Sequence, residues 1–301
     1  MGCTLCPRRC GADRAAGETG FCRMPAEVFV ARAALHFFEE PPISGKNGSG
    51  TVFFSGCPLG CIYCQNRAIS RPEGAVPPGK PHSVKELAAL FLRVQAAGAH
   101  NLNLVTPTHY ADRIAEALRA AKPHLHIPVI YNTGGYELPE TLRELAGLVD
   151  IYLPDFKYIS PALSGAYSAA PDYAVRVRAA IAEMYRQVGG VVCENGLMKK
   201  GLIVRHLVLP GCRADSIAVL RGLAELLPRD RFYLSLMRQY TPDFAPPCAP
   251  AALRRRLTTF EYNSVAKVAE ELGFIGFFQQ KESASAAFTP DFTGENGGGL
   301  L

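Results

Sequence analysis

Three cysteines with metal-ligand spacing, Cys57, Cys61 and Cys64, stand in a C-x3-C-x2-C pattern. A closed zinc site takes four protein ligands, and an iron–sulfur cube takes one cysteine for each of its irons. A set of three thiolates therefore leaves one coordination position for another ligand. We expect a metal centre at which a substrate or cofactor fills that position. The alternative is an incomplete zinc site that borrows His36 or Cys193.

A second set of cysteines lies upstream, with a C-x2-C-x3-C-x11-C spacing among several glycines. Its members are Cys3, Cys6, Cys10 and Cys22. Glycine lets a ligand loop curl tightly enough to point two sulfurs at one ion, and four ligands can close a site. We expect a second metal site here, which holds either zinc or an accessory iron–sulfur cluster. The isolated Cys193, Cys212 and Cys248 are expected to carry no metal.

Composition and charge narrow the class of protein. With 301 residues, of which 48% are hydrophobic, the chain can form one large α/β barrel or two ordinary domains. The net charge of +5 is mild and scattered, which argues against a nucleic-acid partner. No apolar stretch suits a membrane helix or a signal peptide, so we expect a cytoplasmic protein without membrane contact. In that compartment the cysteines are more plausible as metal ligands than as disulfides.

The elements that must position these residues alternate along the chain. Apolar and β-branched runs predict strands at 51–55, 101–105, 129–131, 149–153, 202–209 and 232–237. Amphipathic patterns predict helices at 83–97, 110–121, 138–148, 173–187, 216–227 and 253–272. A strand-like stretch at 28–38 precedes them, and a short apolar run at 274–278 follows. This alternation predicts a parallel α/β sheet with right-handed crossovers, closed into a partial (β/α)6 TIM-like barrel.

The three-cysteine loop directly follows the first of these strands, where parallel sheets and barrels place their active sites. We expect three regions: a small cysteine-rich metal-binding segment at 1–45, the barrel at 46–281, and a tail at 282–301. The glycines at 297–299 should be mobile. Phe288, Pro290 and Phe292 are the tail residues that could pack on the body.

These features together resemble a known family. The C-x3-C-x2-C motif, with Tyr63 just before its last cysteine, and the (β/α)6 alternation resemble the radical S-adenosylmethionine (SAM) enzymes. The strings F-F-S-G-C-P-L-G-C-I-Y-C-Q-N, V-R-H-L-V-L-P-G and Y-L-P-D-F-K-Y are similar to the pyruvate formate-lyase activating enzymes. The start C-T-L-C-P-R-R-C-G-A-D-R resembles their less characterised homologues that carry an N-terminal four-cysteine segment.

The resemblance implies a 4Fe-4S cluster on Cys57, Cys61 and Cys64, with SAM on the fourth iron. It further implies reductive cleavage of SAM to a 5′-deoxyadenosyl radical, which abstracts hydrogen from a substrate. That substrate could be a protein, as for an activase that installs a glycyl radical. An electron donor such as flavodoxin or ferredoxin is the implied partner. A non-enzymatic zinc-binding or interaction module is the alternative reading of both cysteine sets.

The resemblance also implies cofactor contacts, carried over by position: Tyr63 near the adenine; Asn132, Thr133, Asp155 and Lys157 at the ribose or methionine moiety; and Arg205, His206 and Gln239 closing the site. Where the family usually has a G-G-E-like turn after the second strand, this chain has T-P-T-H, and Thr106 and Thr108 are the cofactor contacts carried over to that position.

The period of two along a strand adds two expectations from the residues themselves. Asp155 and Lys157 should share a face, whereas only one of Arg205 and His206 should point into the barrel. His109 stands at a strand–helix junction, where a capping or core role and a catalytic role are both open.

Overall fold

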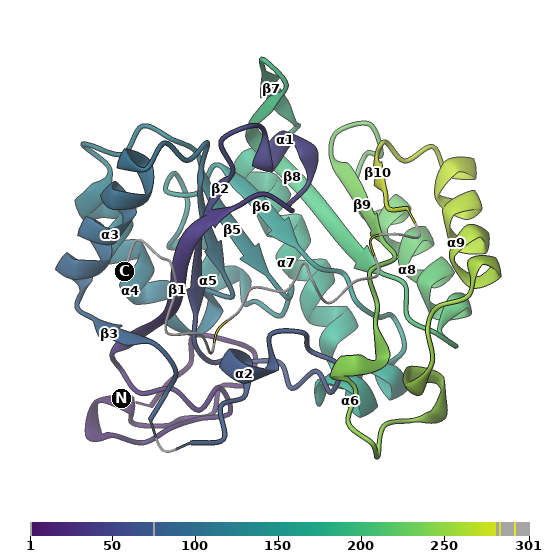
Figure 1. Ribbon diagram of the computed structural model, residues 1–301, viewed down its shortest axis with the longest axis horizontal. Coiled ribbons are helices and arrows are strands. Elements are labelled where there is room, and N and C mark those ends of the chain that lie inside the picture. The colour runs from purple at the N-terminus through teal and green to yellow at the C-terminus, as the bar shows by residue number, and fades with distance from the viewer. Residues whose placement is uncertain (1, 75, 281–282, 284–291, 293–301) are drawn as a thin grey trace.

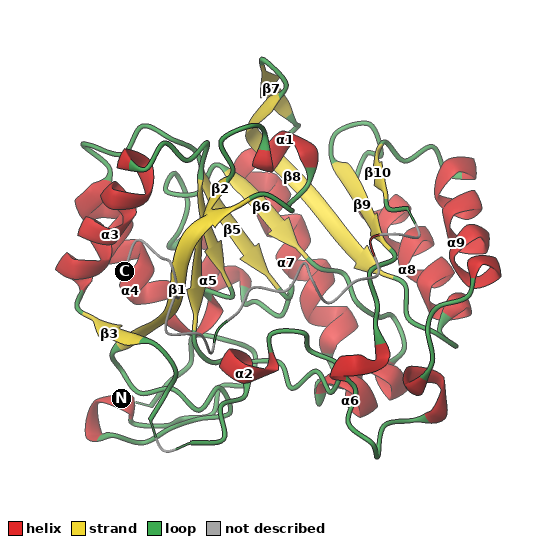
Figure 2. Ribbon diagram, in the orientation of Figure 1, coloured by secondary structure: helices red, strands yellow, loops and turns green. Residues whose placement is uncertain are grey.

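A single curved sheet organises the chain, with helices along its outer side (Figures 1 and 2). The computed structural model describes residues 2–74, 76–280, 283 and 292. The strand order is β10-β9-β8-β6-β5-β4-β2-β1-β3, and β7 pairs with β8 off this path. Because the ends of this order do not pair with each other in the described part of the chain, the sheet is an open, partial barrel. The fold is mixed α/β with parallel strands, as the alternation predicts.

The strands of the barrel wall run parallel to one another. They are β2 (Ser49–Phe54), β4 (Leu102–Val105), β5 (Val129–Thr133), β6 (Ile151–Pro154), β8 (Leu197–Leu207), β9 (Tyr233–Met237) and β10 (Gly276–Phe278). The expected strands are all present, and the apolar run at 274–278 supplies β10 beside β9. The sheet therefore continues one strand past the expected six.

One edge of the sheet is antiparallel. Here β1 (Val28–His36) pairs with β2 on one side and with β3 (Lys80–His82) on the other. Residues expected to belong with the cysteine-rich segment thus contribute a strand to the main sheet. The short α1 (Pro41–Ser44) connects β1 to β2, and α2 (Arg67–Ser70) follows the three-cysteine loop.

The covering helices are α3 (Val84–Ala96), α4 (Ala111–Ala121), α5 (Pro139–Arg143), α6 (Pro161–Ser168), α7 (Tyr173–Val188), α8 (Arg213–Leu226) and α9 (Thr259–Glu271). Short 3₁₀ turns lie at Arg14–Ala16, Thr108–Tyr110, Pro242–Phe244 and Ala251–Arg254. Helix α3 begins at a capping box, in which Ser83 and Glu86 satisfy each other's backbone N–H groups. Its apolar face, which includes Leu87 and Phe91, is fully buried.

Two expected helices are shorter in the structure. The helix expected at 138–148 ends at Arg143 and continues as turns. The helix expected at 253–272 is interrupted because Thr258 and Glu261 form a new capping box, from which α9 starts. Helix α6 and the β7 (Val192–Glu194) to β8 hairpin were not expected. The sequence contains a signal for this hairpin, because Asn-Gly is a preferred pair for a two-residue turn. Asn195 and Gly196 at the turn both adopt the positive φ that such a turn requires.

The N-terminal segment lies at the foot of the sheet, at the end where the parallel strands finish (Figure 1). Of the tail residues expected to pack on the body, Phe292 does so, with its ring centroid 5.3 Å from that of Phe53. Phe288, Pro290 and the glycines at 297–299 lie outside the described residues. No described helix combines the length and apolar character needed to cross a bilayer.

Candidate functional site

The three-cysteine loop leaves β2 at Gly56, where φ is +84° and an added Cβ would lie 2.2 Å from Met24 Cγ. Only glycine fits this turn. Cys57, Cys61 and Cys64 then line one cavity at the carboxyl ends of the strands. We call it the cysteine cavity. Its other lining residues include Leu59, Tyr63, Asn66, Thr106, Asn132, Thr133, Gly134, Asp155, Lys157, Arg205, Gln239, Tyr240 and Thr241.

The three thiols are suited to metal coordination. Burial raises the pKa of Cys57 and of Cys61, and the neighbouring cysteines raise the pKa of Cys57 further. These groups become stable thiolates only when a cation offsets the cost, and a coordinating metal does this. In the described part of the chain, no three His, Cys, Asp or Glu side chains surround a point that fits a single metal ion. Three thiolates leave one ligand position open, both in a tetrahedral zinc site and in a four-iron cluster.

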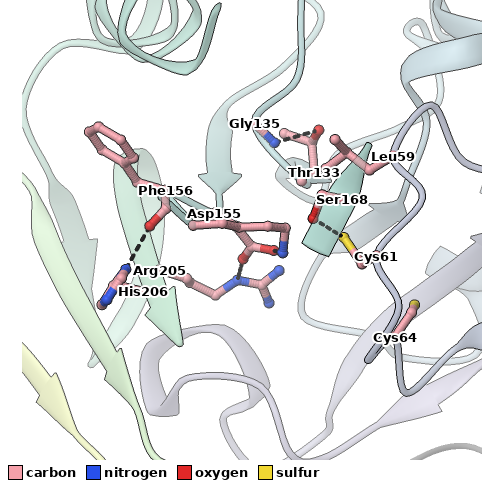
Figure 3. Close-up of polar contacts among 12 residues, drawn as sticks. Leu59, Cys61, Cys64, Thr133, Gly135, Asp155, Phe156, Ser168, Arg205 and His206 are labelled. Carbon is pink, nitrogen blue, oxygen red and sulfur yellow. Dashed lines mark hydrogen bonds and ion pairs between the residues drawn. The ribbon is translucent and has the colours of Figure 1, made fainter. Parts of the chain in front are cut away.

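A line of hydroxyl groups supports one of these cysteines. Cys61 Sγ lies 3.0 Å from Ser168 Oγ (Figure 3). Ser168 Oγ in turn lies 3.0 Å from the Tyr158 hydroxyl. The Tyr158 hydroxyl pairs with that of Tyr63. The Tyr63 ring packs edge-on against Tyr240, with centroids 6.1 Å apart. Tyr63 thus lines the cavity through a fixed ring, as its expected place beside a cofactor requires.

The predicted pair Asp155 and Lys157 shares a face and is joined by an ion pair, with Nζ 2.6 Å from Oδ2. Arg205 Nε donates to the other Asp155 oxygen at 2.9 Å (Figure 3). Arg205 Nη2 donates to Asn132 Oδ1 at 2.6 Å. Burial alone would raise the pKa of Asp155, but the two cations outweigh it and hold the pKa below its usual value. Asp155 is therefore a buried carboxylate that stays ionised and fixes both cations at the cavity wall.

Arg205 and His206 point to opposite sides of β8. Arg205 lines the cysteine cavity, whereas His206 is buried away from it and bonds through Nδ1 to the Phe156 carbonyl oxygen at 2.7 Å (Figure 3). Burial lowers the pKa of His206 to about 4, so the ring is neutral at physiological pH. The structure thus resolves the alternation in favour of Arg205, and the expected cofactor contact of His206 is wrong.

The turns after β4 and β5 are tied together by a buried acid that the sequence analysis missed. Glu137 is fully buried and accepts hydrogen bonds from Thr133 and, at 2.5 Å, from Thr108. Burial raises the pKa of Glu137 to about 7. Thr108 is not among the cavity's lining residues, contrary to expectation, because its hydroxyl supports Glu137. Thr106 does line the cavity and adopts a positive φ of 59°.

Of the two roles open to His109, core packing and catalysis, the structure supports core packing. Its Nε2 lies 2.6 Å from the Ser55 carbonyl oxygen, and burial lowers its pKa to about 3. Arg14 of the N-terminal segment bonds the His109 carbonyl oxygen at 2.6 Å. This neutral, enclosed histidine fixes the end of β2 and offers no group to the cavity.

The N-terminal segment clamps the three-cysteine loop. Arg8 donates to the carbonyl oxygens of Pro58 at 2.8 Å and of Ala169 at 2.5 Å, and its guanidinium lies 3.7 Å above the Phe21 ring. Thr141 donates to the Leu5 carbonyl oxygen at 2.9 Å. The segment therefore holds the three-cysteine loop in place, although its residues are not among those that line the cavity.

The upstream cysteines lie within this clamp: Cys6 and Cys22 are buried, Cys3 is half-buried and Cys10 is exposed. Burial raises the pKa of Cys6 to about 12, and the charges of Cys22 and Cys3 add to the rise. The four do not surround a single-ion site among the described residues. Metal binding by this set stays a prediction.

Several features of the cysteine cavity suit a polar cofactor. The Thr241 hydroxyl and Asn66 Oδ1 line it, and these buried atoms have no hydrogen-bond partner in the described part of the chain. Gly134 lets the chain pack closely against Leu59, since a Cβ at this position would lie 2.8 Å from Leu59 Cδ1. A ligand with hydrogen-bonding groups would satisfy these atoms.

Comparison with known proteins identifies a family and similar proteins. A sequence model described as the radical SAM superfamily matches residues 51–211. The uncharacterized protein MJ0674 of Methanocaldococcus jannaschii is 29% identical over 285 residues, which cover 89% of this chain and 74% of that protein. The crystal structure of Streptococcus suis SuiB bound to S-adenosylmethionine aligns with 74% of this chain at 13% identity and a TM-score of 0.49. The chain spans about half of SuiB, 47% of its length.

Proposed function

This chain belongs to the radical SAM superfamily, and on that premise we propose that it cleaves S-adenosylmethionine reductively and removes a hydrogen atom from an organic substrate. Membership in the superfamily implies a 4Fe-4S cluster and SAM. The cluster and SAM, when bound, supply the electron and the radical for this reaction. The observation that carries the proposal is the presence of Cys57, Cys61 and Cys64 in one cavity with the fixed polar groups of β5, β6 and β8.

In this proposal Cys57, Cys61 and Cys64 hold the cluster. Tyr63, Asn132, Thr133, Asp155, Lys157 and Gln239 bind the cofactor, and Arg205 holds Asn132 and Asp155 in place. Lys157 offsets the charge of the thiolates, because its ammonium group favours ionisation of both Cys57 and Cys61. Arg8 and the hydroxyl line from Tyr63 to Ser168 keep the loop rigid, which helps to exclude water from a reactive intermediate.

The test is anaerobic reconstitution with iron and sulfide, followed by reductant and SAM. We expect a brown protein that forms 5′-deoxyadenosine, and we expect Cys61→Ala to lose both properties. Cys193→Ala is the matched control, because Cys193 is exposed and lies outside the cavity. An intact cluster with no 5′-deoxyadenosine would refute the proposal. Zinc in place of iron would support the non-enzymatic alternative.

The N-terminal cysteines are proposed to hold zinc or a second cluster. Their proximity supports this, since the charges of Cys3 and Cys10 both raise the pKa of Cys22. About four irons per chain would assign Cys3, Cys6, Cys10 and Cys22 to zinc or to structure, whereas about eight would assign them a cluster. Cys6→Ser should then lose only the second metal.

A narrower form of the proposal is an activase that installs a glycyl radical on a partner enzyme, with flavodoxin or ferredoxin as the electron donor. The sequence strings shared with pyruvate formate-lyase activating enzymes support it. The measurement is electron paramagnetic resonance of a co-encoded candidate enzyme after anaerobic incubation. A glycyl radical would support the activase, and a silent spectrum beside active SAM cleavage would count against it.

A further inference from the structure

A second cavity opens off the cysteine cavity, and the two share Asn66, Asn132 and Arg205 in their walls. We call it the inner cavity. Gln239 lines both cavities as well, and the inner cavity is further lined by His36, Phe38, Glu39 and Phe53. It encloses about 120 Å³, which is room for about four water molecules at about 30 Å³ each. A small substrate group in this space would lie next to the cofactor.

The acid in the wall of the inner cavity is Glu39, which lies in the connection after β1. Glu39 Oε1 accepts from Asn103 Nδ2 at 3.1 Å and from Asn132 Nδ2 at 3.4 Å, and its Oε2 lies 3.6 Å from Arg205 Nη1. The Glu39 side chain is only 11% exposed. Three elements far apart in the sequence therefore hold one carboxylate at the wall of a cavity.

Charged side chains of both signs surround the inner cavity. The carboxylates of Glu39, Glu40 and Asp155 lie close enough to Arg205 to raise its pKa, whereas burial lowers it. Arg205 pairs with Glu39 and Asp155, and Lys157 pairs with Asp155. On the side of His36, burial and the charge of Arg32 both lower the pKa of the histidine. Among the described residues that line the cavity, Glu39 is the carboxylate and Arg205 is its direct partner.

The free hydrogen-bonding atoms at this end of the site are acceptors. Asn103 is wholly buried and Glu40 keeps only 9% of its surface, yet Asn103 Oδ1 and Glu40 Oε2 receive no hydrogen bond from the described part of the chain. Asn66 Oδ1, in the cavity wall, likewise receives no hydrogen bond from the described part of the chain. Buried acceptors without donors are costly. Asn103 and Glu40 are not among the lining residues, but Asn66 is, so an N–H group of a ligand in the cavity would satisfy Asn66 Oδ1.

Arg205 does not make the inner cavity an anion site. Its Nε, Nη2 and Nη1 groups already face Asp155, Asn132 and Glu39. A carboxylate on the substrate would displace one of these partners and would lie beside the Glu39 carboxylate.

We propose that the inner cavity is a substrate subsite for a cationic, N–H-rich group, an ammonium or a guanidinium, that pairs with Glu39. The inference rests on the proposed function, in that the cation would hold a substrate beside the cofactor. The pairing has a pH signature. Burial raises the pKa of Glu39 to about 7, with Arg205 acting in the opposite direction. Glu39 should therefore release a proton when a cation binds near neutral pH.

The test uses reconstituted holoenzyme with SAM and four small probes of similar size, followed by ligand-observed NMR. The probes are methylguanidine, methylammonium, neutral N-methylurea and anionic acetate. We expect at least one cation to bind ten-fold more tightly than N-methylurea at pH 8, and acetate not to bind. Cation affinity should fall at least five-fold at pH 6, because Glu39 takes up a proton.

Glu39→Gln should reduce cation affinity at least ten-fold and remove the pH dependence. Glu73→Gln is the matched control, since Glu73 is 82% exposed and remote from the cavity lining. Equal binding of N-methylurea, preference for acetate, or unchanged affinity in Glu39→Gln would each overturn the proposal. If that variant misfolds, the probe selectivity and pH dependence of the unaltered protein decide the question alone. Binding is measured whether or not SAM is cleaved, so failure of the proposed function gives a different result.

Discussion

Replacement of Asp155 by asparagine tests whether one carboxylate holds the wall of the cysteine cavity together. Asp155 is 13% exposed and contacts Lys157 at 2.6 Å and Arg205 at 2.9 Å. Asparagine keeps the size of the side chain but removes the charge, which leaves two buried cations with less compensation. Breaking a buried ion pair on one side costs about 3–5 kcal/mol. We expect the free energy of unfolding of Asp155→Asn to fall by about that amount.

The control is Asp172→Asn, which makes the same change in a surface pair. Asp172 lies 2.8 Å from Arg176, but these side chains are 40% and 39% exposed. Exposed pairs contribute about 0.2–1 kcal/mol. Urea unfolding of both variants under anaerobic conditions should give a difference of at least about 2 kcal/mol. Equal losses in the two variants would refute the claim that Asp155 compensates buried charge.

Three further perturbations follow from single contacts. Gly135→Ala should destabilise the protein by more than Gly147→Ala. Both positions have a positive φ, which alone costs alanine about 1 kcal/mol, but only at position 135 would a Cβ meet backbone, 2.3 Å from the Asp155 carbonyl oxygen. Thermal unfolding compares the two variants. Thr258→Ala should cost about 1 kcal/mol in urea unfolding because α9 loses its N-cap, and an unchanged midpoint would contradict this. The lowered pKa of His206, about 4 against 6.5, means that the unfolded chain binds a proton first as pH falls. The contribution of His206 to stability should therefore drop by about 1.4 kcal/mol per unit between pH 6.5 and 4. The difference in the free energy of unfolding between the unaltered protein and His206→Gln should change by that amount over this range.

The barrel wall was predictable because its strands are short apolar runs between helical patterns. The spacing of Asp155 and Lys157 also placed both on one face, since a strand alternates strictly. Alternation could not choose between Arg205 and His206. That choice depends on register, in which Arg205 pairs with Ser235 and bridges to Asp155. Register is a property of the assembled sheet, which no local pattern encodes.

The inner cavity could not be predicted from the sequence, for a related reason. Glu39 stands in E-E-P-P, which reads equally well as a solvated turn. Its place beside Arg205 exists only because β1 runs antiparallel to β2 and returns the chain across the barrel. Glu137 was missed in the same way, because its partner Thr108 comes from the neighbouring strand's turn.

The clamp made by Arg8 has a consequence for how this protein is made. Its acceptors on Pro58 and Ala169 lie 50 and 161 residues further along the chain. A ribosome adds about 5–20 residues per second, so the cysteines between 57 and 64 emerge on the order of ten seconds before Ala169 exists. During that interval the thiols are open to oxidants and to adventitious ions. The three-cysteine loop is thus held in place only after residues synthesised well after it have folded against Arg8.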